Sequence, residues 1–270
     1  MAVKEGLTYC PRRDCVEGLE TTNVNPEQDV KPLRASHALV FMARGIKKNW
    51  KQVLGYFFTS KGASKNVDTV KWVTQSIDIL KGCNLKVITT VCDQGPANLV
   101  GNETQRKMTA SWDQIEKLYE HDNEQVLSHS VASALSLLSS GLMTPGFGAE
   151  SYFTAEFVGT MNFLFDSLNS KVPYSNKPHH GAARTDSGHL ELWQSMVSWI
   201  ETWEFRDARG KKISPASKKG WIMTLRAMEG IWKSLEGYQM KYLLLNRFNQ
   251  DCLENTLSFR RRRGGGPGHS

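Results

Sequence analysis

The chain has 270 residues, 40% of them hydrophobic, with a formal net charge of +7 and five cysteines. This composition excludes a wholly disordered chain, and the longest apolar runs are too short to cross a bilayer. The number of cysteines is odd and their spacing is irregular, which indicates a reducing compartment. The positive charge favours a polyanionic partner, although a basic surface with no nucleic-acid partner explains it equally well.

The first ninety residues predict strands and one helix. Residues 6–10 and 16–19 flank a polar turn, as in a β-hairpin. Residues 37–42 and 53–59 are two further strands, and residues 67–80 carry apolar side chains at helical spacing, with Gly82 expected just past the helix end. Residues 85–91 form another strand. This order is typical of the start of an RNase H-like sheet, but other α/β folds begin in the same way.

The rest of the chain is predicted to be mostly helical. Ser214 is placed as the N-cap of one helix, with Pro215 in its first position. A polar loop covers residues 171–187, and we expect its paired histidines His179 and His180 to be exposed to solvent. Further helices are predicted at residues 112–119, 125–138, 151–168, 190–203 and 251–260, a short strand at 242–245, and a flexible tail after the basic run 260–263.

Two acidic residues are candidates for metal chemistry. Asp93 directly follows an apolar strand, at the sheet edge where ligands commonly bind, and it equally fits an Asp that begins a turn. Glu254 shares a helix face with Asp251, where both acids also suit the helix dipole. Two-metal phosphodiester chemistry needs several converging carboxylates that bind Mg²⁺ or Mn²⁺. We find only two.

Other enzyme classes have no matching motif in the sequence. The chain has no Gly-x-x-x-x-Gly-Lys-Ser/Thr loop, which disfavours a Walker-type ATPase, and no nucleophile elbow of a serine or cysteine hydrolase. Asp166 and Asn169 lie where a helix ends. Their side chains either read a base or simply terminate that helix.

Several short segments, taken in order, resemble the P-element transposase family and its THAP-type relatives. They include residues 37–46, 91–95, 163–169 and 249–255. The resemblance implies an RNase H-like mixed sheet interrupted by a mostly helical, GTP-binding insertion. It also implies that Asp93 and Glu254 are the second and third catalytic metal ligands, and that Asp166, Asn169 and Asp251 contact the guanine nucleotide.

The resemblance sets the expected organisation as well. Residues 1–98 and 241–263 would form the RNase H-like part, residues 99–240 the insertion, and residues 264–270 a flexible tail. Family members cut and rejoin DNA with Mg²⁺ or Mn²⁺ and use GTP as a cofactor. The resemblance therefore implies DNA and GTP as partners, a homo-oligomer, work in the nucleus, and no membrane association.

Two departures from the family pattern affect these expectations. The first catalytic acid of the family would lie upstream of Met1, and a further strand between Asn98 and Trp112 is expected to be missing. We therefore expect a transposase fragment that is inactive as this isolated chain. The alternatives are an active enzyme with further upstream residues, and a domesticated DNA- or GTP-binding protein without catalysis.

Overall fold

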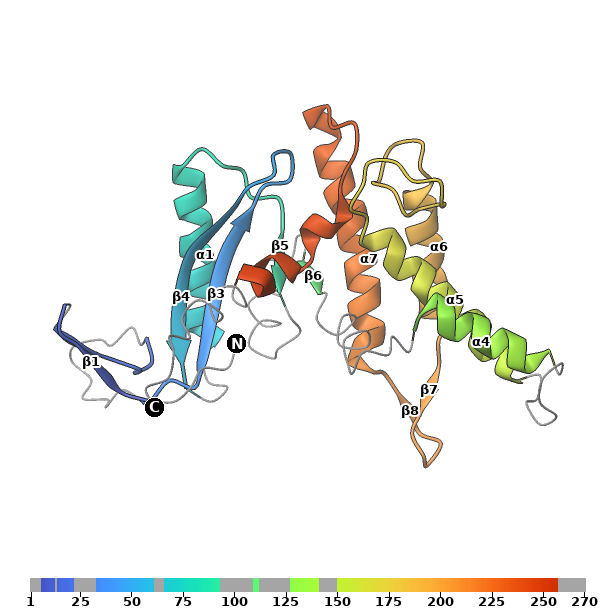
Figure 1. Cartoon of the computed structure of the whole chain (residues 1–270), viewed down its shortest axis with the longest axis horizontal. Helices are drawn as coiled ribbons and strands as arrows, with labels where there is room; N and C mark the ends of the chain where they lie inside the picture. Colours follow the sequence, from blue (N-terminus) through green and yellow to red (C-terminus); the bar gives the residue numbers. More distant parts are fainter. Residues whose placement is uncertain are drawn as a thin grey trace, which may run out of the picture. The chain divides into compact units, whose positions relative to one another are not determined.

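The computed structural model describes residues 6–12, 14–21, 33–60, 66–92, 109–111, 127–140 and 150–256. The chain forms two compact units. Unit 1 comprises Met1–Ile88 and Gly95–Arg106, and unit 2 comprises Thr89–Gln94 and Lys107–Ser270. Both units contain strands and helices, so the chain has a mixed α/β fold (Figure 1). The described strands pair in twos.

Unit 1 contains the two predicted antiparallel strand pairs. β1 (Thr8–Cys10) and β2 (Cys15–Glu17) form a short hairpin. β3 (His37–Arg44) and β4 (Lys51–Thr59) form a longer ribbon whose register shifts between Phe41 and Met42. Val, Phe and Tyr side chains favour such ribbons because they fit a pleated, half-buried surface.

Helix α1 (Asn66–Gly82) packs on this ribbon through one tryptophan. Trp72 is 3% exposed, and its ring stacks on Phe57 of β4 with 4.2 Å between the ring centroids. The predicted position of Gly82 just past the helix end is wrong, since Gly82 is still helical. Asn84 takes the left-handed position instead, with φ of 59°. The Leu85 and Asn84 amides donate to the carbonyls of Leu80 and Lys81, which closes the helix in a Schellman motif.

Unit 2 begins with a parallel strand pair, β5 (Thr90–Cys92) and β6 (Thr109–Ser111). The strand predicted at residues 85–91 is thus shorter and shifted towards Cys92. The expectation that no strand lies between Asn98 and Trp112 is wrong, because β6 occupies residues 109–111. Three residues are too few to show the alternation by which a strand is recognised in a sequence.

Four helices form most of the rest of unit 2. They are α4 (His129–Ser139), α5 (Glu150–Leu168), α6 (His189–Glu201) and α7 (Ala216–Leu235). All four begin and end at most four residues from where they are predicted. Ser128 caps α4 by accepting a hydrogen bond from the Val131 amide. The helix predicted at residues 112–119 falls outside the described residues.

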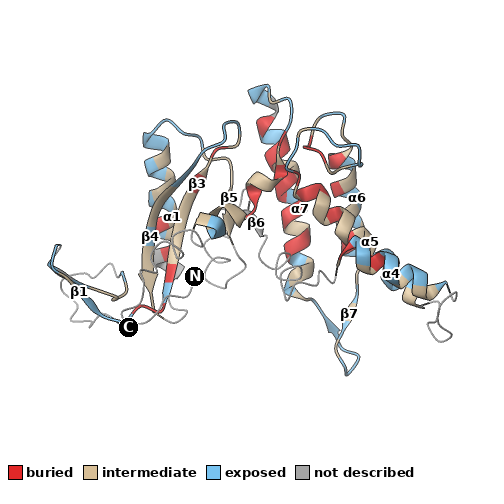
Figure 2. Cartoon of the chain, in the orientation of Figure 1, coloured by how far each residue is buried: buried red, intermediate tan, exposed pale blue. Residues whose placement is uncertain are grey.

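The core of unit 2 lies among α5, α6 and α7, where buried residues gather (Figure 2). Large apolar side chains from all three helices are at most 2% exposed, namely Met161, Leu164, Leu168, Trp193, Ile200, Trp221, Leu225, Met228 and Ile231. Burying a side chain of this size stabilises the fold by roughly 1.5–3 kcal/mol. No described helix is long and apolar enough to cross a membrane.

Two connections differ from the sequence prediction. A hairpin of β7 (Phe205–Arg206) and β8 (Lys212–Ile213) joins α6 to α7, where no strand was predicted. The strand predicted at residues 242–245 is absent. That region contains the 3-10 helices η1 (Glu236–Tyr238) and η2 (Leu245–Phe248), with an isolated bridge from Leu243 to Ala183 between them. Residues 251–256 are helical, and residues 257–270 fall outside the described part.

Candidate functional site

The C-terminal segment of unit 2 docks on the end of α5 through backbone hydrogen bonds. Ser170, which is 2% exposed, accepts the Leu245 amide at Oγ (3.2 Å) and the Asn246 amide at its carbonyl oxygen (3.1 Å). Ala183 and Leu243 exchange two further backbone hydrogen bonds. These contacts bring residues 249–251 next to the C-terminal end of α5.

Asn249 links two of the predicted site residues. Its Nδ2 donates to Asp251 Oδ2 at 2.7 Å and to Asn169 Oδ1 at 3.3 Å. Asn169 and Asp251 are thus brought together as the sequence-based hypothesis requires, although they are far apart in the chain. Asn249 is 8% exposed, and in the described part of the chain its Oδ1 has no hydrogen-bond partner. A buried acceptor left unpaired costs roughly 1–3 kcal/mol, so this oxygen suits a donor from a ligand.

Asp166 lies one turn before Asn169, on α5. Its Oδ2 accepts a hydrogen bond from Asn162 Nδ2 at 3.1 Å, and His180 Nε2 lies 3.6 Å from the same oxygen. Asn169 is the first residue after α5, and its backbone amide donates to the Asp166 carbonyl oxygen at 3.2 Å. The loop that carries His180 therefore helps to fix the Asp166 carboxylate.

The two loop histidines are half-buried, so the prediction that they are exposed to solvent is wrong. The loop folds back on α5, and His179 packs edge-on against Phe163, with 5.2 Å between the ring centroids. His179 also meets the ring of His189 edge-on. The side chains of His179 and His180 point in different directions. The ring of His179 contacts Phe163, whereas His180 lies near Asp166.

His189, the first residue of α6, is neutral at pH 7. It is 2% exposed, and its ring nitrogens lie 2.7 Å from Ser187 Oγ and 3.2 Å from the His179 carbonyl oxygen. Burial, reinforced by the neighbouring His179, lowers the pKa of His189 from 6.5 to about 4. This imidazole therefore serves as an uncharged link between the loop and α6.

The three predicted nucleotide contacts share one chemical property. The carboxylates of Asp166 and Asp251 and the amide oxygen of Asn169 are hydrogen-bond acceptors. The edge of a guanine base presents donors, the N1–H and the 2-amino group, which adenine does not present in the same pattern. These acceptors, contacted by Asn162, His180 and Asn249, suit a partner that presents hydrogen-bond donors.

The structure does not test whether the two predicted metal ligands lie close together, because Asp93 falls outside the described residues. Glu254 is exposed in the helical segment 251–256, where its backbone amide donates to the Gln250 carbonyl oxygen. Across the described ranges, no three His, Cys, Asp or Glu side chains are grouped so that they could hold a metal ion. The metal role of Asp93 and Glu254 therefore stays a prediction.

Comparisons with known proteins identify the family. Residues 1–101 match the TNP-like RNase H N-terminal domain, and residues 123–181 match the TNP-like GTP-binding insertion domain. The Transposable element P transposase of Drosophila melanogaster is 29% identical over 113 residues, which are 42% of this chain and 15% of that protein. The chain belongs to the P-element transposase family.

The likeness to the P-element family extends to the fold. The solved Drosophila P element transposase strand transfer complex matches 98% of this chain and 70% of the transposase chain, with a TM-score of 0.74 and 18% identity. Asp166, Asn169 and His180 lie inside the segment that matches the GTP-binding insertion domain of the family, whereas Asn249 and Asp251 lie outside both matched segments. The contact through Asn249 thus joins the matched insertion segment to the C-terminal part of the chain.

Sequence reasoning missed Asn249, His180 and Asn162 as residues of this site. Asn249 begins the same segment, residues 249–255, that carries Asp251 and Glu254, so a signal was present for it. The sequence prediction placed His180 in a loop, exposed to solvent. Its contact with Asp166 depends on how the loop 171–187 folds, which no spacing pattern in the sequence encodes.

Proposed function

We propose that this chain binds a guanine nucleotide through Asp166, Asn169 and Asp251 and acts in P-element-type DNA transposition. The observation that carries the proposal is the buried amide of Asn249, which holds Asn169 and Asp251 together from distant parts of the chain. The match of residues 123–181 to a GTP-binding insertion domain supports it independently.

In this proposal the side chains contact different parts of the nucleotide. Asp251 and Asp166 accept the N–H groups of the guanine base, and Asn169 accepts or donates to the rest of the nucleotide. A bound nucleotide supplies hydrogen-bond donors to acceptors that are otherwise only partly satisfied, including Asn249 Oδ1. A site built to accept hydrogen bonds from one base rejects a base without those donors by a large factor, because its own groups are left unpaired.

Equilibrium binding of GTP and ATP, measured by calorimetry on the whole chain, tests this proposal. We expect saturable GTP binding, much weaker ATP binding, and at least a tenfold loss of GTP affinity in Asp251→Ala. Asp78→Ala is the matched control, since Asp78 is an exposed carboxylate of unit 1 that pairs with Lys81. Absence of GTP binding at millimolar nucleotide, or an equal loss in both variants, would refute the proposal.

A second proposal concerns catalysis. We infer that Asp93 and Glu254 serve as Mg²⁺ or Mn²⁺ ligands for DNA cleavage and strand transfer by a homo-oligomer in the nucleus. The match of residues 1–101 to an RNase H N-terminal domain supports it, since Asp93 lies in that range. Because the sequence predicts an inactive fragment, we expect no strand cleavage by the whole chain in Mn²⁺. Cleavage that is lost in both Asp93→Ala and Glu254→Ala would instead establish an active enzyme and the metal role of these two acids.

The alternative is a protein that has kept nucleotide or DNA binding without catalysis. The same pair of assays separates the two: GTP binding without any cleavage supports the binding protein, and cleavage that depends on Asp93 supports the nuclease.

A further inference from the structure

The β7–β8 hairpin carries a concentration of positive charge. It joins the end of α6 to the start of α7 and extends away from the helices of unit 2 (Figure 1). Residues 204–219 contain six basic side chains against two acidic ones. The basic residues are Arg206, Arg209, Lys211, Lys212, Lys218 and Lys219.

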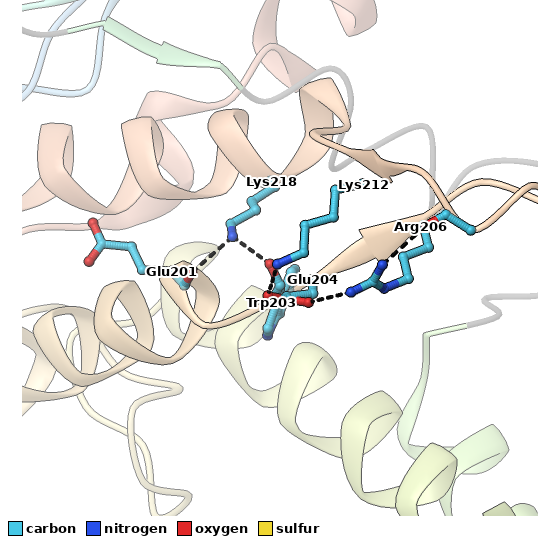
Figure 3. A network of polar contacts seen from close by, with 7 residues as sticks. Glu201, Trp203, Glu204, Arg206, Lys212 and Lys218 are labelled. Carbon is cyan, nitrogen blue, oxygen red and sulfur yellow. Dashed lines mark hydrogen bonds and ion pairs between the residues drawn. The ribbon is translucent and has the colours of Figure 1, made fainter.

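Both acidic side chains are engaged within the hairpin itself. Glu204 pairs with Lys212 at 2.5 Å and with Arg206 at 3.4 Å (Figure 3). The hydrogen bond from Lys212, followed by the charge of that lysine, lowers the pKa of Glu204, so this carboxylate is ionised at neutral pH. Asp207 Oδ1 accepts the backbone amides of Arg209 and Lys211, both at 2.9 Å. Glu204 is thus paired with basic residues of the two strands, while the Asp207 carboxylate stays on the turn beside Arg209 and Lys211.

The tip of the hairpin is a closed, hydrogen-bonded turn. The Asp207 amide donates to the Lys211 carbonyl oxygen, and the Gly210 amide donates to that of Asp207. Gly210 has φ of 78°, a conformation that glycine adopts without strain. Arg209 and Lys211 are exposed on this turn, and in the described part of the chain their side chains form no ion pair. The turn thus presents two unpaired cations and the Asp207 carboxylate from a fixed backbone, and residues 204–219 as a whole keep an excess of four positive charges.

The base of the hairpin is anchored to the helices. Lys218 Nζ donates to the carbonyl oxygens of Glu201 (2.9 Å) and Trp203 (2.6 Å) at the C-terminal end of α6 (Figure 3). Trp203 packs against the rings of Trp199, Phe157 and Phe205. A cation at a helix C-terminus is favourable because it offsets the helix dipole. The hairpin is therefore held at both ends.

We propose that this hairpin, with Lys219 beside it on α7, contacts the phosphate backbone of duplex DNA. Arg and Lys side chains on a fixed turn suit phosphate oxygens, and phosphate contacts supply most of the sequence-independent affinity of proteins for DNA. A two-stranded β-ribbon also has the size that the major groove of about 12 Å admits. This surface lies outside the nucleotide site and does not depend on it. An acidic protein surface is the competing partner that the experiment must exclude.

The experiment measures binding of the whole chain to a short fluorescent DNA duplex by anisotropy, without nucleotide, over a range of salt concentrations. The test variant is Arg209→Gln with Lys211→Gln. The control is Lys177→Gln with Lys241→Gln, which removes the same charge from exposed positions at the opposite end of α6 and α7. GTP affinity and the melting temperature are measured for every variant, so that misfolding is recognised.

The proposal predicts that the hairpin variant binds duplex at least about tenfold more weakly. It also predicts that the slope of log affinity against log salt falls by roughly 2, because each phosphate contact contributes about 0.9 to this slope. The control variant keeps the wild-type slope, and Arg209→Glu with Lys211→Glu binds more weakly still. An unchanged slope in the hairpin variant, an equal loss in the control, or competition by polyglutamate as effective as that by unlabelled duplex would overturn the proposal.

Discussion

Asn249 is the residue on which the candidate nucleotide site depends. Replacing it with Ala removes the donor that Asn169 Oδ1 and Asp251 Oδ2 share. We expect Asn249→Ala to lower the free energy of unfolding by about 1–3 kcal/mol, since two half-buried acceptors lose their donor, and to weaken GTP binding as well. Urea unfolding and calorimetry measure the two effects. Asn255→Ala is the control, as Asn255 is exposed and lies six residues further along the chain. Equal stability of both variants would contradict this role.

His189 makes stability depend on pH. The pKa of His189 is about 4 in the folded chain and about 6.5 when unfolded, so between these values only the unfolded chain takes up the proton. The contribution of His189 to the free energy of unfolding is therefore fully present above pH 6.5. It is lost as the pH drops towards 4, by up to about 3 kcal/mol. Urea midpoints from pH 7.5 to 4 measure this loss. In His189→Gln we expect a shallower decline, and an unchanged decline would show that other groups cause it.

At the residue scale, the sequence suggests candidate acceptors but not the side chains that contact them. Asp166, Asn169 and Asp251 come from short segments that resemble a family. Asn249 brings Asn169 and Asp251 together, and the nucleotide role of all three stays a prediction. Asn162 and His180 were missed because their role is to orient Asp166. Such a role depends on tertiary contacts, which a single sequence does not display.

At the scale of elements, the end of α1 gives a direct test of the capping arrangement. Asn84→Ala should destabilise the chain by about 1 kcal/mol, because a left-handed conformation is unfavourable for Ala, whereas Asn84→Gly should not. Gly82→Ala should raise the free energy of unfolding by about 0.5–1 kcal/mol, since Gly82 is helical and an added Cβ meets nothing within 4 Å. Thermal unfolding distinguishes the variants. A loss of stability in Gly82→Ala would show that Gly82, and not Asn84, ends the helix.

Element prediction succeeded where hydrophobic periodicity is long. The apolar side chains at helical spacing in α1, α5, α6 and α7, and the β-branched and aromatic runs of β3 and β4, gave these elements within a few residues. The two-residue strands of β7 and β8 are too short to produce a pattern. The apolar run 242–245 was misread as a strand because Leu243 and Leu245 are buried against the bundle, with no partner strand along the run.

At the scale of the whole molecule, the two units should respond differently to nucleotide. All proposed contacts lie in unit 2. A ligand at a hundred times its Kd stabilises the folded state by about 2.7 kcal/mol, so GTP should slow amide exchange in α5, α6 and α7. Amides of β3, β4 and α1, in unit 1, should exchange at the same rate with and without GTP. Mass spectrometry of deuterium uptake measures this difference, and protection confined to unit 1 would place the nucleotide elsewhere.

The organisation of the whole chain was predicted less completely. The family resemblance led to the mixed α/β fold and to the matched RNase H and GTP-binding segments. The parallel pair of β5 and β6 was not foreseen, because a missing strand was inferred from segment lengths alone. Sequence spacing shows how many residues separate two motifs, whereas the pairing of β5 with β6 depends on contacts across that interval.

The central claim, that Asp251 reads a guanine base, is tested most directly by changing the base that the site prefers. Xanthine carries a carbonyl oxygen where guanine carries its 2-amino group, so an Asn side chain, which both donates and accepts, suits xanthine better than a carboxylate does. Calorimetry of Asp251→Asn with GTP and with xanthosine triphosphate is the measurement. We predict at least a tenfold loss of affinity for GTP together with a gain for xanthosine triphosphate. Unchanged affinities for both nucleotides would contradict the claim.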